Sequence, residues 1–318
     1  MPVNLDYLSL RLIRHFMPRA WVHFLLRYNL IIQPGFETRV PKETVTRYLK
    51  TLENTGRSIQ GQRILNFGYG GNYALACGLL QAGASHVTLI DKFANPDDRR
   101  NRKLLPEYER YLIRKDGQVI PCLEFIDLLE GDIHDAAISV DGNFRFLEVG
   151  CADTPASAII EQNNGIAPFD IVLSSSVFEH LDDVGSITRS LAALTRPDGL
   201  QLHFIDLRDH YFKYPFEMLT YSEKTWQRWF NPSSNLNRYR LLDYQRTFEE
   251  YFTDVQMTVL ERDLVEFNKA ANRIRPEFLS GNAEFDSVTL IMALVVGPKN
   301  PSMVSTAVNY KNSTSNPV

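Results

Sequence analysis

A strand, a glycine-rich turn, a helix and a second strand follow one another in the first third of the chain, and this order constrains the fold most. Residues 63–67 are a short apolar run, and the turn Gly-Tyr-Gly-Gly-Asn at 68–72 follows directly. Helix-forming residues occupy 73–81, and the β-branched run 86–90 closes the unit. Such a βαβ unit places its two strands parallel in one sheet, which predicts an α/β fold with helices on both faces.

The glycine turn also predicts a ligand. Glycine is needed where φ is positive or where a ligand approaches the backbone, and open α/β sheets bind ligands at the carboxyl ends of their strands. Asp91 ends the second strand, where a carboxylate can accept hydrogen bonds from both hydroxyls of a ribose. A dinucleotide fingerprint, GxGxxG, would need a third glycine where Tyr73 stands. A turn without any ligand would leave the acidic residue unexplained, so a nucleoside-containing ligand is favoured.

Composition and charge exclude several other classes of protein. With 44% hydrophobic and 23% charged residues, the 318-residue chain is not intrinsically disordered. A net charge of -4 argues against general electrostatic binding to nucleic acid. Three scattered cysteines without a CxxC pair disfavour a disulfide framework and a cysteine zinc site. We find no membrane span and no signal peptide, so a soluble, cytoplasmic protein without stable membrane insertion is expected.

The N-terminal segment predicts two helices. Leu8, Leu12 and Phe16 recur four residues apart, which is typical of one face of an amphipathic helix, and a second helical run spans 21–31. Contact with a membrane surface is one interpretation of this basic, apolar pair. We favour the other, in which residues 1–55 are a helical cap packed on the main domain through these apolar stripes.

Strand and helix patterns continue toward the C-terminus, so one main domain is predicted over 56–297. The polar segment 93–142 interrupts it and is interpreted as a helix-rich insertion. Residues 298–318 are rich in Asn, Ser, Thr and Pro and predict a disordered tail. The further predicted strands are 144–149, 169–174, 200–205, 255–260 and 288–296, with a helix over 184–194.

Four stretches make the chain resemble a class I S-adenosylmethionine-dependent methyltransferase. They are "ILNFGYGGN", "HVTLID", "FDIVLSSSVFEHL" and "LTRPDGLQLHFID". With the segments between them they cover about half of the chain. The resemblance implies a Rossmann-like, seven-stranded, mostly parallel sheet that ends in a C-terminal antiparallel hairpin. It also implies S-adenosyl-L-methionine as the cofactor.

The resemblance further implies a cofactor site along the carboxyl edge of the sheet. The glycine turn would pass under the methionine part of the cofactor, and Asp91 would hold the ribose. Ser174, at the end of the fourth strand, would face the sulfonium. For the adenine we prefer Asp153, which follows the 144–149 strand pattern, over Asp132. The predicted cofactor-binding residues are Asn66, Gly68, Tyr69, Gly70, Asp91, Lys92, Asp153 and Ser174.

Two positions depart from the family pattern. Asn66 stands where an acidic residue is usual, and Asn72 replaces the third glycine. These departures keep open an alternative, a binding or scaffold protein that retains the fold without turnover. A nicotinamide-dependent oxidoreductase is a less favoured alternative, against which Tyr73 argues.

Methyl transfer to an oxygen or nitrogen requires a base, and histidine suits that role near neutral pH. His180 follows the fourth strand and His210 follows the fifth, so both are candidate catalytic residues. The structural alternatives are a helix start for His180 and a salt-bridged loop for His210, and function is slightly favoured for His210. His203 lies within a strand and is predicted to be buried. Carboxylates near a histidine are too common to predict a metal, so none is expected.

Aromatic residues are concentrated between positions 211 and 230, where they make up 8 of 20 residues against 11% overall. The segment 208–250 is predicted either as a lid over the acceptor or as a small helical subdomain with its own core. Stacking on single-stranded nucleic acid ranks last, because few basic residues interleave. The predicted reaction is methyl transfer to an oxygen or nitrogen of a small molecule, such as a natural product or specialised metabolite. A carbon acceptor and a homodimer stay open.

Overall fold

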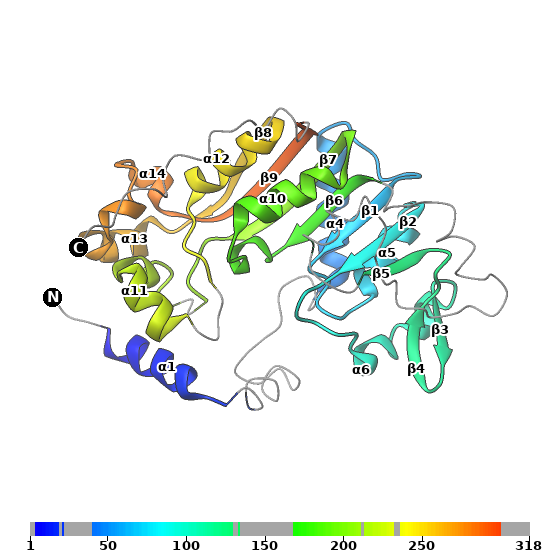
Figure 1. Ribbon diagram of the computed structural model, residues 1–318, viewed down its shortest axis with the longest axis horizontal. Coiled ribbons are helices and arrows are strands. Elements are labelled where there is room, and N and C mark those ends of the chain that lie inside the picture. Colours follow the sequence, from blue (N-terminus) through cyan, green and yellow to red (C-terminus); the bar gives the residue numbers. More distant parts are fainter. Residues whose placement is uncertain are drawn as a thin grey trace, which may run out of the picture.

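A seven-stranded sheet with the order β5-β2-β1-β6-β7-β9-β8 forms the centre of the computed structural model (Figure 1). The pairs from β5 to β7 are parallel, and β9 is antiparallel to both of its neighbours. This order confirms the Rossmann-like fold with a C-terminal antiparallel strand pair. The strands are β1 (Arg63–Phe67), β2 (His86–Ile90), β5 (Ile126–Leu129), β6 (Phe169–Ser175), β7 (Thr195–Asp206), β8 (Phe252–Arg262) and β9 (Val288–Pro298). The structure describes residues 4–18, 21, 40–129, 133, 168–210, 213–231 and 236–299.

Helices cover both faces of the sheet, because its central strands are apolar on both sides. Consecutive residues of a strand point to opposite faces. Ile64 accordingly packs with α4 and α5, whereas Leu65 packs with α10 and α12. A strand buried on both faces reads as a continuous apolar run, as β1 does. The four helices are α4 (Pro41–Asn54), α5 (Ala74–Gln81), α10 (Val184–Ala193) and α12 (Leu241–Tyr251).

We predicted a helix-rich insertion over 93–142, and its described part, residues 93–129 and 133, contains strands as well as short helices. This segment contains the edge strand β5, which pairs parallel with β2, and a separate two-stranded hairpin. Asp116 and Gly117 turn the hairpin with positive φ. Strand β5 lies beside β2, while 130–132 and 134–167, which include the predicted strand 144–149, lie outside the described residues. The other elements here are α6 (Asp98–Asn101), α7 (Leu105–Tyr108), β3 (Leu112–Lys115) and β4 (Gln118–Pro121).

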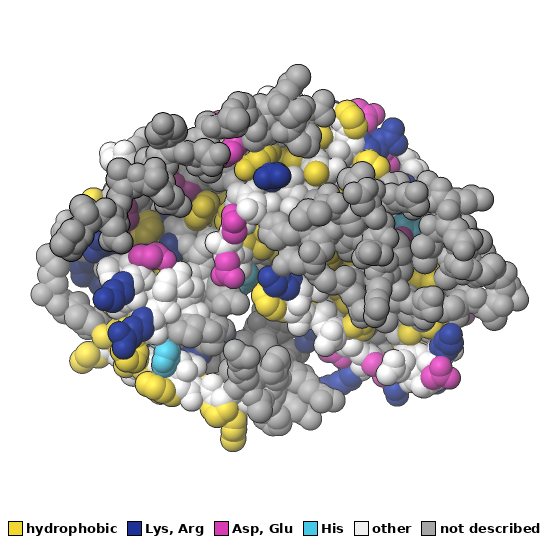
Figure 2. Space-filling model, in the orientation of Figure 1, with side chains coloured by type: hydrophobic (Ala, Val, Ile, Leu, Met, Phe, Trp, Pro, Cys, Tyr) yellow, Lys and Arg dark blue, Asp and Glu magenta, His cyan; other side chains and the backbone are white. Residues whose placement is uncertain are grey.

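Helix α1 (Leu5–Phe16) packs with only the first residue of its predicted apolar stripe, Leu8, against the protein. It contacts η4 (Trp226–Phe230), which directly follows α11 (Glu223–Thr225), and its buried residues are Tyr7 and Arg11. Leu12 and Phe16, expected to face the core, are 38% and 71% exposed. Hydrophobic side chains accordingly stand out in Figure 2 along the edge where α1 lies. The second predicted helix lies outside the described residues apart from Trp21.

The aromatic segment forms a third core of its own with α13. Phe216, Trp226 and Phe230 are buried there against Phe267 and its neighbours. For these three rings, the structure favours the interpretation of the aromatic segment as a small subdomain with its own core over the interpretation as a lid. Helix α12 packs on the sheet instead, so 208–250 is not one unit. The remaining described elements are η2 (Phe178–His180), η3 (Glu217–Thr220), α13 (Leu264–Ala270), η5 (Ala271–Arg273), η6 (Pro276–Phe278) and α14 (Ala283–Asp286).

The absence of a membrane span and the disordered C-terminal tail can be compared with the structure only within the described residues. In the part of the chain that the structure describes, no helix has the length and apolar character needed to cross a bilayer. Strand β9 extends to Pro298, and the predicted tail from residue 300 onward lies outside the described residues.

Candidate functional site

The glycine turn between β1 and α5 requires its glycines. Gly68, Gly70 and Gly71 all have positive φ, of 88°, 64° and 76°, a region that residues with a Cβ rarely adopt. The Gly68 N–H donates to the carbonyl oxygen of Ile90 at 2.8 Å, which ties the turn to the end of β2. The sequence-based argument for glycine at these positions is therefore confirmed by the backbone.

Two of these glycines also make room for other parts of the protein. A Cβ on Gly68 would lie 2.2 Å from Cγ2 of Val177, and one on Gly71 would lie 2.3 Å from the carbonyl oxygen of Asn95. The missing side chains at 68 and 71 thus permit close protein contacts. Gly70 is the glycine of the turn that contacts the predicted ribose-binding carboxylate.

Asp91 joins the turn to the end of β2. Its Oδ2 accepts a hydrogen bond from Gly70 N–H at 2.9 Å, and Oδ1 accepts from Phe93 and Ala94 N–H at 2.9 and 2.8 Å. A carboxylate has about four acceptor positions, and Asp91 is only half-buried. The side chain can therefore order the turn and still accept from a hydroxyl group. This donor and acceptor set fits the ribose of the implied cofactor.

The other predicted cofactor residues lie in different environments. Asn66 is fully buried in β1, and Lys92 is exposed beside Asp91. Tyr69 is buried and stacks on Tyr73, with ring centroids 6.3 Å apart. Asp153, predicted for the adenine, lies outside the described residues, as does its rival Asp132.

Ser174 takes part in a buried network instead of facing the cofactor edge. Its Oγ is hydrogen-bonded to Nδ1 of His203 at 2.7 Å, and Nε2 of His203 contacts Oε1 of Gln201 at 2.8 Å. Burial lowers the pKa of His203 to about 3, so the ring is neutral. The prediction of a buried His203 is confirmed. The expected contact between Ser174 and the sulfonium is not supported, because the hydroxyl is committed within the sheet.

Arg47 of α4 reaches the end of β6, and sequence analysis missed it. Its guanidinium donates to Ser175 Oγ at 2.8 Å and lies 3.8 Å from the ring centroid of Phe204. A guanidinium at this position can bind a carboxylate in bidentate geometry, through two N–H···O hydrogen bonds. The sequence feature that could have indicated a role for Arg47 in the site was its position as a basic residue on the helix that precedes β1.

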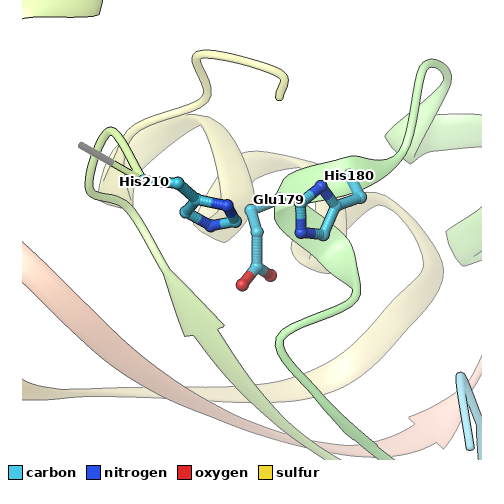
Figure 3. Close-up of side chains that lie close together, drawn as sticks. All are labelled: Glu179, His180 and His210. Carbon is cyan, nitrogen blue, oxygen red and sulfur yellow. The ribbon is translucent and has the colours of Figure 1, made fainter. Parts of the chain in front are cut away.

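Glu179, His180 and His210 meet at the carboxyl edge of the sheet. The first two lie in η2 after β6, and His210 lies in the loop after β7. Since β6 and β7 are neighbouring parallel strands, the loops that follow them begin side by side. The two imidazole centroids are 4.9 Å apart, and Figure 3 shows the Glu179 side chain between the rings. The histidines that we predicted as alternatives are thus neighbours.

Burial determines the charge of this cluster. Glu179 is 2% exposed, and neither carboxyl oxygen has a hydrogen-bond partner among the described residues. Burial, followed by the charge of Asp206, raises the pKa of Glu179 well above its usual value. The backbone amides of Glu179 and Asp206 act in the opposite direction and lower this pKa. Burial, with a smaller contribution from His180, lowers the pKa of His210 to about 3.

Residues distant in sequence hold both loops in place. The Asn237 side chain donates to the carbonyl oxygens of Phe178 and Leu181, at 2.7 and 3.1 Å, and braces η2. On the other loop, the carboxylate of Asp209 accepts hydrogen bonds from Arg11 and from the Tyr7 hydroxyl. No motif signalled Asn237 or Arg11, because each acts across a long separation in the chain. The contact between Val177 and Gly68 places the glycine turn next to η2.

Comparison with known proteins identifies a family. A family model described as a methyltransferase domain matches residues 13–256. No curated protein matches the chain. Among solved structures, the chain is similar to magnesium protoporphyrin IX methyltransferase from Synechocystis PCC 6803 with bound SAH, at 13% identity and a TM-score of 0.42, covering 89% of this chain and 96% of that one.

Two further solved structures are similar to a comparable degree. A putative sarcosine dimethylglycine methyltransferase from Galdieria sulphuraria is 12% identical, with a TM-score of 0.42 and coverage of 80% of this chain and 85% of that one. An S-adenosylmethionine dependent methyltransferase from Mesorhizobium loti is 13% identical, with a TM-score of 0.38 and coverage of 78% and 96%.

Proposed function

Since this chain belongs to the methyltransferase-domain family and is a class I S-adenosylmethionine-dependent methyltransferase, we propose that it methylates an oxygen or nitrogen of a small-molecule acceptor beside Glu179, His180 and His210. The observation that carries this proposal is the cluster itself, in which Glu179 is buried and the two histidines are half-buried, and which lies next to the glycine turn. Two imidazoles and a carboxyl group at the edge where the cofactor belongs are suited to removing a proton from an acceptor.

The cofactor would be held by groups from three elements. Asp91 accepts the ribose hydroxyls, and Arg47 binds the carboxylate of the methionine part. Because β5 is the strand beside β2 and ends at Leu129, we now favour Asp132 over Asp153 for the adenine. When bound, S-adenosylmethionine supplies the methyl group on a sulfonium, which leaves as the neutral thioether.

The protein's own contribution is to position the acceptor, exclude water and take up a proton. Methyl transfer is an in-line displacement, so alignment of the acceptor atom accounts for much of the rate. The lowered pKa keeps His210 neutral at physiological pH, so that its ring can accept a hydrogen bond from the acceptor's O–H or N–H. A ring of such low basicity takes up the proton only as methyl transfer makes the acceptor atom cationic and therefore strongly acidic.

A titration followed by a transfer assay tests the proposal. Calorimetric titration with S-adenosylmethionine should show binding to the wild-type chain, and absence of binding at millimolar cofactor would favour the scaffold alternative. Incubation with methyl-labelled cofactor and pooled hydroxyl- and amine-bearing small molecules should then transfer label. His210→Gln should lower turnover while leaving the cofactor dissociation constant unchanged, and equal activity would move the proton acceptor elsewhere.

A further inference from the structure

We propose that Glu179, His180 and His210 form a binding site for a divalent transition-metal cation of the Zn²⁺, Mn²⁺ or Co²⁺ class. The inference deepens the proposed function, because it assigns a ligand to the same three side chains. It does not depend on turnover, because cation binding can be measured in the protein alone.

The geometry of the cluster is close to that of a metal site. Each residue offers one ligand atom, and these three atoms all lie within 4.8 Å of one another. Nitrogen and oxygen ligands bind such cations at about 2.0–2.2 Å, so each atom needs to move by less than about one ångström to share one ion. The two rings and the carboxyl group converge on a common space in Figure 3. Two imidazoles and one carboxylate are a ligand set that first-row transition metals prefer.

The environment of Glu179 gives an independent reason to expect a cation. Buried polar atoms in proteins are almost always hydrogen-bonded, and each exception calls for an explanation. Both carboxyl oxygens of Glu179 are buried without a hydrogen-bond partner among the described residues. A neutral carboxyl group would still leave both oxygens without a partner. A bound cation would satisfy the group and restore its charge.

The surrounding charges are compatible with a dication. Two arginines lie near the cluster, and each is paired with a carboxylate. Arg11 pairs with Asp209, and Arg208 binds both oxygens of Asp206. Arg14 contributes one further positive charge near His210. The negative charge that Glu179 would carry faces the cluster from inside, where solvent screening is weak.

The cation also narrows the class of acceptor. Three protein ligands leave coordination positions for an oxygen of the acceptor. A divalent cation polarises a bound hydroxyl group and makes its proton easier to remove. A hydroxyl-bearing acceptor, such as an alcohol, a phenol or a vicinal diol, is therefore favoured over an amine. In the loaded protein the histidines would serve as ligands, and the proton of the cation-bound hydroxyl group would leave to solvent water.

Metal titrations of the purified full chain test the site. Protein stripped with a chelator is titrated separately with Zn²⁺, Mn²⁺ and Co²⁺ by calorimetry, and Co²⁺ is also followed by its visible absorption. The wild-type chain should bind at least one of these ions at one per chain. Glu179→Gln, which preserves shape, and His210→Gln should each weaken that binding about tenfold or more.

The matched control is His86→Gln. His86 and Asp127 form another histidine–carboxylate pair, with Nε2 and Oδ2 2.9 Å apart. They belong to β2 and β5, which lie on the other side of β1 from β6 and β7. This variant should bind metal like the wild type. The inference fails if the wild-type chain binds none of the three ions, or if Glu179→Gln binds them as tightly as the wild type does.

Cofactor titration of the same stripped samples separates the two proposals. Binding of S-adenosylmethionine without metal binding would overturn the metal site and leave the proposed function standing. Metal binding without cofactor binding would overturn the proposed function and support the metal site. A melting temperature of each variant close to that of the wild type, measured without metal, shows that a loss of binding is local.

Discussion

Arg11 and Asp209 form an ion pair in which both side chains are almost completely buried, at 1% and 0% exposure, although 198 residues separate them. The Tyr7 hydroxyl donates to the same carboxylate at 2.6 Å, and the Arg11 guanidinium lies over the ring of Trp226. Asp209 immediately precedes His210. Helix α1 therefore holds the loop that brings His210 to Glu179 and His180.

Asp209→Asn should strongly destabilise the protein. The substitution leaves Arg11 buried without its counter-charge, which costs about 3–5 kcal/mol in comparable buried pairs. The measurement is the free energy of unfolding in urea. Asp6→Asn is the control, because Asp6 pairs with Lys213 on the surface and its loss should hardly change that free energy. Equal effects of the two substitutions would contradict the role of the buried pair.

Asp91→Ala should weaken cofactor binding by about 1–3 kcal/mol, the range for leaving buried polar groups without a partner. The substitution removes the ribose acceptor and also the acceptor for Gly70 N–H. Calorimetric titration with S-adenosylhomocysteine measures the change. Asp127→Ala, at the neighbouring edge strand, should bind like the wild type. Unchanged affinity of Asp91→Ala would remove the ribose role.

Arg47→Ala should weaken binding of S-adenosylmethionine while sparing adenosine. Only the first ligand carries the amino-acid carboxylate that we assign to the Arg47 guanidinium. The affinity ratio of the two ligands, measured by competition, isolates that contact from any general loosening of α4. Lys50→Ala, an exposed residue of the same helix, is the control. A parallel loss for both ligands would place the carboxylate elsewhere.

Stability should fall in acid because of His203. The pKa of this buried ring is about 3 in the folded protein and about 6.5 when unfolded, so the unfolded state binds the extra proton between these values. The contribution of the neutral His203 ring to the free energy of unfolding is complete above about pH 6.5, decreases as the pH falls, and is lost near pH 3. The slope is about 1.4 kcal/mol per pH unit for one such group.

Urea unfolding of wild-type and His203→Gln proteins at pH 7.5 and 5.5 measures this contribution. The free energy of unfolding should drop further for the wild type than for the variant over this interval. The ring of His210 is also neutral and adds a second contribution of the same sign in both proteins. A variant that keeps the full wild-type pH dependence would show that His203 is not the responsible group.

Local sequence was informative for most of the seven-stranded sheet, but it did not predict β5, the β3–β4 hairpin or the orientation of α1. The strand–turn–helix–strand unit, β6, β7 and the antiparallel C-terminal pair could be predicted, because their apolar runs are long or follow a glycine turn. Strand β5 was missed because four residues are too few to show a period. The apolar stripe of α1 was misplaced because a buried ion pair, and not hydrophobic periodicity, decides which side faces the protein.

The sequence by itself determined six of the seven strands of the main sheet, where the backbone needs glycine, and that Asp91 follows β2 beside the turn, since these depend on neighbours along the chain. Only the tertiary structure decided that His180 and His210 are neighbours, that Glu179 lies buried between them, and that Ser174 is committed to His203. The physical reason is that burial and charge depend on neighbours in space. Adjacent parallel strands β6 and β7 bring together side chains about thirty residues apart, and desolvation there sets their protonation.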